Sequence, residues 1–114
     1  MEARAQLRYY RSSPRKVRLL ADMVRGKTVE PALTSLKLSN KYAAHDVEKV
    51  VRSALANLEQ AQPGVDVDKV FIRSIRVDDG PRLRRGRPAS KWVRMHRILK
   101  RMCHITVELS VREN

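Results

Sequence analysis

The sequence has little of what secreted, membrane-bound or disulfide-bonded proteins use. Its single cysteine, Cys103, cannot close an internal disulfide, which fits a reducing compartment. No apolar run approaches the roughly 18 residues of a membrane span. The first residues, Met-Glu-Ala-Arg-Ala-Gln, lack the apolar centre of a signal peptide. The sequence therefore predicts a cytoplasmic protein that has no membrane partner.

Motifs for catalysis and metal binding are also missing. His45, His96 and His104 are far apart in the sequence, whereas a zinc site needs about four convergent ligands at recognisable spacing. There is no Walker loop, no Gly-x-Gly-x-x-Gly and no nucleophile elbow. Cys103 alternates with apolar neighbours, so a buried thiol is expected rather than a nucleophile. We expect no enzymatic activity, no metal and no cofactor.

Aromatic residues make up only 4% of the chain, and the one tryptophan, Trp92, lies in a basic stretch between Lys91 and Arg94. Single-strand-binding folds place several aromatic rings on one sheet, so this composition argues against them. Trp92 has two interpretations that the sequence leaves open. It can pack on its own neighbours, or it can stack on an unpaired base, which RNA offers more readily than duplex DNA.

Negative charge is absent where positive charge is densest. Residues 80–101 hold nine Lys or Arg and no Asp or Glu, within a chain of net charge +13. Residues 1–30 hold eight basic and three acidic side chains, and residues 31–79 hold seven of each. Charge of one sign at this density repels itself, so the segment needs an anionic partner before it adopts one shape. Acidic membranes or proteins also attract basic chains, but confinement of the charge to two zones favours nucleic acid.

Hydrophobic periodicity predicts one α+β domain, with three helices packed on a small three-stranded antiparallel sheet. Strands are expected over residues 3–9, 70–77 and 103–111, where apolar residues alternate or β-formers gather. Helices are expected between Pro14 and Gly26, over about 29–38, and over roughly 41–61. Asn40 is predicted to cap the third helix.

The first predicted helix combines an apolar stripe with a basic face. Ser12 or Ser13 can cap it, with Pro14 in the first turn, and Gly26 can end it in a left-handed conformation. Its cations lie off the apolar stripe: Arg15, Lys16, Arg18 and Arg25. A basic helix face is often simply exposed to solvent and binds no ligand. Exposed backbone N–H groups and serines beside the cations make a phosphate site somewhat more favourable.

Two of the predicted strands bracket the basic stretch. The simplest arrangement is an antiparallel pair of strands that continues into a long hairpin. With about 12 residues in each leg, this hairpin would reach roughly 40 Å beyond the globular body. Asp78-Asp79-Gly80-Pro81 interrupts the first leg, either as a turn or as a kink at an edge, and a turn role for the two aspartates is favoured over metal binding or acid-base chemistry. An isolated two-stranded ribbon is marginal in water, so this arm should become ordered only against its partner. We therefore expect a globular body of residues 1–79 and 102–114 and an extended basic hairpin of residues 80–101.

Several of these stretches together resemble the large-subunit ribosomal protein twenty-two family. Residues Arg11 to Lys27 resemble its first-helix signature, and Val77 to Pro81 resemble the start of its hairpin. Arg97 to Arg101, followed by His104 to Val107, resemble the end of that hairpin. Order, spacing and total length agree from end to end.

The resemblance implies a structural protein that binds large-subunit rRNA during assembly, with its hairpin lining the nascent-peptide exit tunnel. The implied partners are large-subunit rRNA, neighbouring large-subunit proteins and the nascent polypeptide, and no homo-oligomer is expected. The implied rRNA-binding residues are Arg11, Ser12, Arg15, Lys16, Arg18, Arg25, Lys27, Arg82, Arg84, Arg85, Arg87, Lys91, Arg94, Arg97, Lys100, Arg101 and His104. The implied tunnel-lining tip comprises Arg84, Arg85, Gly86, Arg87, Pro88, Ala89, Ser90, Lys91 and Trp92.

Two other classes of function were weighed against this one. A DNA-compacting or regulatory protein could place the hairpin as a β-ribbon in a DNA groove. A nucleic-acid-modifying enzyme would need an acid, base or metal constellation that the sequence lacks.

Overall fold

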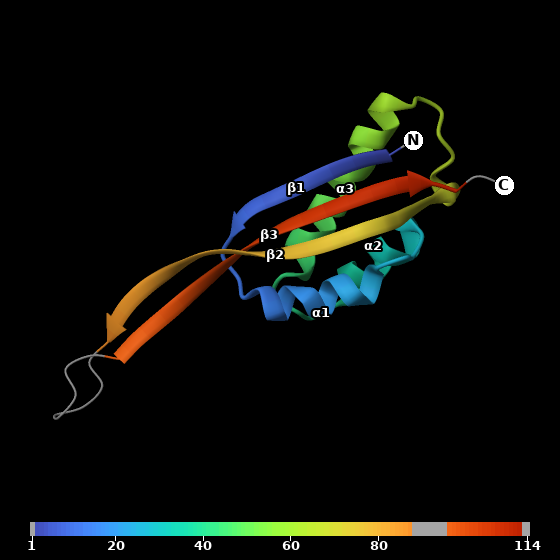
Figure 1. Cartoon of the computed structure of the whole chain (residues 1–114). Helices are drawn as coiled ribbons and strands as arrows, with labels where there is room; N and C mark the ends of the chain where they lie inside the picture. The colour runs from blue at the N-terminus through green and yellow to red at the C-terminus, as the bar shows by residue number, and fades with distance from the viewer. Residues whose placement is uncertain (1, 88–95, 113–114) are drawn as a thin grey trace.

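The computed structural model describes residues 2–87 and 96–112, and three helices cover one face of a three-stranded sheet in it (Figure 1). The sheet is antiparallel with the strand order β1-β3-β2. This confirms the predicted α+β class. In chain order the elements are β1 (Glu2–Tyr10), α1 (Pro14–Val24), α2 (Val29–Leu38), α3 (Ala44–Ala61), the 3-10 helix η1 (Val67–Lys69), β2 (Val70–Arg87) and β3 (His96–Val111).

The core lies between the helices and the alternate residues of the strands that face them. Ile105, Val107 and Leu109 of the central strand β3 are completely buried. In β1 the inward positions are the small residues Ala3 and Ala5, which let α3 approach the sheet closely. The apolar stripe predicted for the first helix is confirmed as core in α1. Most apolar residues of α3 follow helical spacing and are also buried, although Leu55 is only partly buried. The period-two and helical patterns of the sequence thus located most of the core.

Both ends of α1 lie where the sequence indicated, but no serine side chain caps it. Ser13 occupies the N-cap position and makes no side-chain capping hydrogen bond. At the other end Gly26 adopts a φ of 79°, a left-handed conformation that glycine accepts without steric cost. The predicted helix is confirmed, and the role given to the serine hydroxyls is not.

The third helix begins later than predicted. It starts at Ala44, with Ala43 at the N-cap position, so Asn40 is not its cap. The Lys41 N–H instead donates to the Ser39 hydroxyl at 3.3 Å, and the Ala44 N–H donates to the Lys41 carbonyl at 3.1 Å. Ala43 and Ala44 are both buried, so packing of these small residues fixes the turn of residues 41–43 ahead of the helix.

Asp78-Asp79-Gly80-Pro81, for which the sequence left a turn and a kink open, forms a kink. The segment lies inside β2, and the pairing register shifts between Asp79 and Arg82, so that Gly80 and Pro81 together oppose Met102. This is a β-bulge, which bends and twists a strand and suits a proline because it interrupts the ladder. A Cβ at Gly80 would lie 3.2 Å from the Met102 carbonyl, which explains the glycine. Of the two interpretations that the sequence left open, the kink at an edge is confirmed.

A second bulge faces the first across β3. The register of β1 shifts between Leu7 and Tyr10, and Tyr9 has a φ of 57° there. Beyond this point β1 ends, whereas β2 and β3 stay paired as far as Arg87 and His96 (Figure 1). We call this two-stranded part, residues 82–87 and 96–101, the ribbon. Residues 88–95, which include most of the predicted hairpin tip, lie outside the described residues.

Candidate nucleic-acid interface

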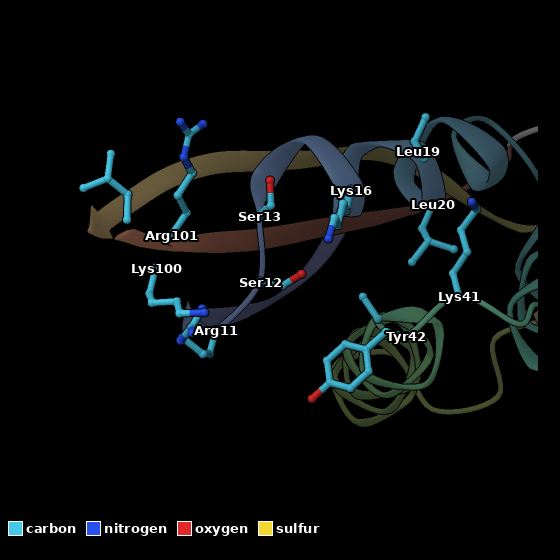
Figure 2. Close-up of a pocket in the computed structure, with 12 residues that line it drawn as sticks. Arg11, Ser12, Ser13, Lys16, Leu19, Leu20, Lys41, Tyr42, Lys100 and Arg101 are labelled. Carbon is cyan, nitrogen blue, oxygen red and sulfur yellow. The ribbon is translucent and has the colours of Figure 1, made fainter. Parts of the chain in front are cut away.

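A groove lies where the start of α1, the turn before α3 and the β3 leg of the ribbon meet (Figure 2). It measures about 570 Å³. Five of its twelve described lining residues are cations and none is acidic. The lining consists of Arg11, Ser12, Ser13, Lys16, Leu19, Leu20, Lys41, Tyr42, Ala43, Leu99, Lys100 and Arg101. Cations from the two basic zones of the sequence, residues 1–30 and 80–101, thus share one concave surface. Such a surface is suited to phosphate groups.

The junction between β1 and α1 places the first group of these residues. The Ser12 N–H donates to the Tyr10 carbonyl at 2.9 Å, and this turn reverses the chain before α1 begins at Pro14. Lys16 follows in the first turn of α1 and points toward the groove (Figure 2). Because Ser13 makes no helix-capping side-chain bond, its hydroxyl remains able to bind a ligand oxygen.

Lys100 and Arg101 come from β3 just beyond the two bulges. There Arg101 pairs directly with Arg82, and Lys100 pairs with Leu83. Like charges opposite each other on an antiparallel pair destabilise it, so the Arg82–Arg101 pair favours an anion nearby. None of the described ribbon side chains at 82, 83 and 99–101 is buried. The ribbon therefore has positive charge to present and little core of its own.

Two of the predicted α1 cations have internal partners. The Arg18 guanidinium donates to the Val77 carbonyl at 3.0 and 3.2 Å and lies 3.5 Å from the Asp79 carboxylate. Arg25 donates to the Ile75 carbonyl at 3.0 Å and pairs with Asp22. These bonds tie α1 to the edge of β2, where β2 has no strand neighbour. Arg18 and Arg25 hold α1 on the sheet, and about half of each side chain remains exposed.

The other predicted cations of the first zone do not line the groove. Arg15 is exposed on α1, and Lys27 follows Gly26 at the far end of that helix. The backbone of Lys27 joins α1 to the sheet, since its carbonyl accepts the Ile72 N–H at 2.9 Å. The structure thus brings together Arg11, Ser12 and Lys16 from this zone and leaves Arg15 and Lys27 apart from them.

His104, another predicted contact, takes part in the bulge of β1. Its Nδ1 accepts the Tyr9 N–H at 2.9 Å, and the Tyr9 ring meets the imidazole edge-on with centroids 4.9 Å apart. An accepting Nδ1 carries no proton, so a neutral imidazole here has its hydrogen on Nε2. His104 therefore supports the backbone where the ribbon leaves the body.

The predicted tip residues are only partly described. Arg84, Arg85, Gly86 and Arg87 continue β2, and the partner of Gly86 on β3 is Arg97. Their backbones pair with β3 as far as Arg87 and His96. Pro88, Ala89, Ser90, Lys91, Trp92 and Arg94 lie outside the described residues.

Sequence reasoning missed Lys41 and Tyr42 as members of the groove. Lys41 was assigned to a helix, and Tyr42 carried no functional role. Tyr42 is 86% exposed, which is unusual for so large an aromatic side chain. The sequence signal was weak, because only the packing of the α2–α3 turn beside the start of α1 brings these residues to the cations.

Other chemistry has no assembled site in the described ranges. No group of three or more His, Cys, Asp or Glu residues able to hold a metal occurs within residues 2–87 and 96–112. Cys103 is buried, as predicted, and burial raises the pKa of its thiol. A raised pKa makes a thiol a poor nucleophile at neutral pH. No helix in the described part of the chain is both long and apolar enough to cross a membrane.

Comparison with known proteins shows the family of the chain. Residues 5–110 match the family described as Ribosomal protein L22p/L17e. A relative from Solibacter usitatus, named Large ribosomal subunit protein uL22, is 42% identical over 113 residues, which cover 99% of both chains. A relative of the same name from Syntrophotalea carbinolica is 54% identical over 111 residues, which cover 96% of this chain and 98% of the relative. Proteins of this family are structural parts of the ribosome and not enzymes. The chain belongs to the L22p/L17e family of ribosomal proteins.

Proposed function

We propose that the chain is a structural constituent of the large ribosomal subunit and binds large-subunit rRNA during assembly. The observation that carries this proposal is the groove, in which five cations and no acidic residue converge from two separated zones of the sequence. Phosphates that meet Lys or Arg release condensed counterions, so such a surface favours a polyanion over any other partner. The names of the two relatives, which both refer to the large subunit, support the choice of rRNA.

Within this proposal the groove residues form the central contact. Arg11, Ser12, Lys16, Lys100 and Arg101 are sequence-predicted members, and Lys41 and Tyr42 join them on structural grounds. The remaining predicted residues act as peripheral phosphate contacts: Arg15, Arg18, Arg25, Lys27, Arg82, Arg84, Arg85, Arg87, Lys91, Arg94, Arg97 and His104. Arg18, Arg25 and His104 combine this role with the internal bonds described above.

The finer part of the proposal concerns the division of the chain. Residues 1–79 and 102–114 act as the body beside neighbouring ribosomal proteins, and residues 80–101 line the nascent-peptide exit tunnel. Support comes from the two bulges next to residues 80 and 102, where β1 ends and the pairing continues with β2 and β3 alone. A basic ribbon without a core of its own suits a surface surrounded by rRNA.

Salt-dependent binding to large-subunit rRNA tests the first part. Lys16→Gln and Arg101→Gln should each weaken binding and lower the slope of log K against log salt by about one unit. Lys49→Gln is the matched control, because Lys49 is exposed on α3 and lies outside the groove. Unchanged affinity and slope in both groove variants, relative to Lys49→Gln, would contradict the role of the groove.

Crosslinking in assembled ribosomes tests the second part. A photo-crosslinker attached at Leu83→Cys, in the ribbon, should react with an arrested nascent chain. The same probe at Leu38→Cys, exposed on α2 of the body, should not. A nascent chain that reacts with position 38 and not with position 83 would exclude the proposed tunnel role of the ribbon.

A further inference from the structure

The groove holds apolar surface as well as positive charge. Tyr42 is 86% exposed and Leu19 is 57% exposed, and both line it. Figure 2 shows the Tyr42 ring on the α3 side of the groove and Arg11 and Lys100 on the other side, with Ser12 between them and Lys16 above, beside α1. Phosphate binding alone would not require an aromatic face at this position.

The backbone that carries Tyr42 is fixed. Ala43 and Ala44 on its C-terminal side are buried in the core, and Lys41 on its N-terminal side bonds to the Ser39 hydroxyl. The turn that presents the ring is therefore already formed, so a ligand that packs on Tyr42 does not have to order this backbone. Aromatic anchors on fixed backbone are effective for this reason.

A nucleotide with an unpaired base is the ligand that matches both features. Its phosphates suit Arg11, Lys16 and the ribbon cations, and its flat base suits the Tyr42 ring. A duplex keeps its base faces stacked and offers only phosphates and groove edges. The groove volume of about 570 Å³ lies within the range of about 300–1,000 Å³ typical of small-ligand sites.

We propose that the groove binds an unpaired rRNA nucleotide, with its base stacked on Tyr42 and its adjacent phosphates bound by Arg11, Lys16, Lys100 and Arg101. This inference rests on the proposed function in that it assumes RNA as the partner. It adds that the groove discriminates single-stranded segments from duplex through one aromatic side chain. The Ser13 hydroxyl, which makes no helix-capping bond, is available to the sugar or phosphate oxygens.

Binding of two six-residue strands with equal phosphate number tests the proposal. One is a single-stranded oligoribonucleotide, and the other is its abasic counterpart. The full-length protein should bind the base-bearing strand more tightly, by about 5- to 100-fold, as expected for one stacked base. Tyr42→Ala should reduce this preference by about 5-fold or more without changing the salt slope, whereas Tyr42→Phe should retain it. Leu38→Ala, which removes another highly exposed apolar side chain outside the groove, should have no effect.

Each outcome supports or overturns the inference. If wild type, Tyr42→Ala and Tyr42→Phe all preferred the base-bearing strand over the abasic strand to the same degree, the stacking of a base on Tyr42 would be overturned. If Lys16→Gln and Arg101→Gln still weakened binding of both strands in that case, the proposed rRNA binding by the groove would remain supported although the stacking would not. Oligoglutamate of the same charge competing as well as the oligoribonucleotide would also overturn the inference, because the groove would then select charge alone. Thermal unfolding of each variant checks that it is folded. Tyr42→Leu, which keeps an apolar side chain but has no flat ring, should behave like Tyr42→Ala.

Discussion

The body and the ribbon use the same two strands in opposite ways. Between residues 103 and 109, β3 lies between β1 and β2, and its inward side chains are completely buried under the helices. Between residues 99 and 101 the same strand pairs with β2, β1 has already ended, and no side chain is buried. One strand therefore passes from a sheet stabilised by a core to a ribbon stabilised by little more than backbone hydrogen bonds.

This difference teaches where the stability of the protein lies and where its function lies. Burial of apolar surface is the main favourable contribution to folding, and the body collects nearly all of it. The ribbon instead places like charges in register, as at Arg82 and Arg101, which costs stability in the free protein. Such an arrangement is useful only if an anion supplies the missing stabilisation.

The largest expected difference is in the free energy of unfolding, between variants at two apolar residues of β3. Ile105→Ala, in the body, should lower the free energy of unfolding by about 2–5 kcal/mol, because the side chain is completely buried. Leu99→Ala, in the ribbon, should change it by about 0.5 kcal/mol or less, because Leu99 is 40% exposed. Urea unfolding monitored by circular dichroism measures both. Equal losses would mean that the ribbon shares the core of the body.

A smaller effect is expected where β1 ends against α3. The Tyr10 hydroxyl donates to the Asp46 carboxylate at 2.6 Å, so Tyr10→Phe should cost about 1 kcal/mol at neutral pH. Burial, followed by the bond to Asp46 and its charge, raises the pKa of Tyr10. Above pH of about 10 the unfolded chain loses this proton while the folded chain keeps it, so stability should fall as pH rises. Unfolding measured from pH 8 to 11 should show a steeper fall in wild type than in Tyr10→Phe, and parallel curves would contradict this.

The smallest expected effect is an increase in stability, whereas Ile105→Ala and Tyr10→Phe are expected to lower it. Arg82→Thr removes one of the paired like charges and introduces a good strand former, so it should stabilise the free protein by about 0.2–1 kcal/mol at low salt. The gain should shrink at 1 M salt because exposed charges are screened. The same variant should bind rRNA more weakly. A loss of stability on this substitution would show that the Arg82–Arg101 pair is not repulsive.

The sequence predicted the body better than the junction with the ribbon. Alternation in β1 and β3 and the stripes of α1 and α3 are local patterns, and burial follows them directly. For Asp78 to Pro81 the sequence allowed a turn or a kink, and pairing with β3 decided for a bulge. Asn40 looked like a cap, yet the burial of Ala43 and Ala44 shifted the helix start. In both places distant contacts decided a local conformation that the sequence alone could not.

The candidate site was predicted in part for the same reason. The sequence named Arg11, Lys16, Lys100 and Arg101 among the implied rRNA contacts, but it could not show that residues 84–90 positions apart in the chain share one groove. It also could not separate these cations from Arg18 and Arg25, whose guanidinium groups bind carbonyls of β2. Tyr42 was missed because its importance depends on its neighbours in space and not on its neighbours in sequence.

Backbone hydrogen exchange along β3 tests the central claim most directly, because one strand reports on both regions. In the free protein, amides of residues 105, 107 and 109 should exchange slowly, near the rate set by global unfolding, and amides of residues 99–101 should exchange much faster. On binding large-subunit rRNA, protection should rise strongly at residues 99–101 and little at residues 105–109. Equal protection of both segments in the free protein, or no gain at residues 99–101 on binding, would contradict the claim that the ribbon depends on RNA for its stability.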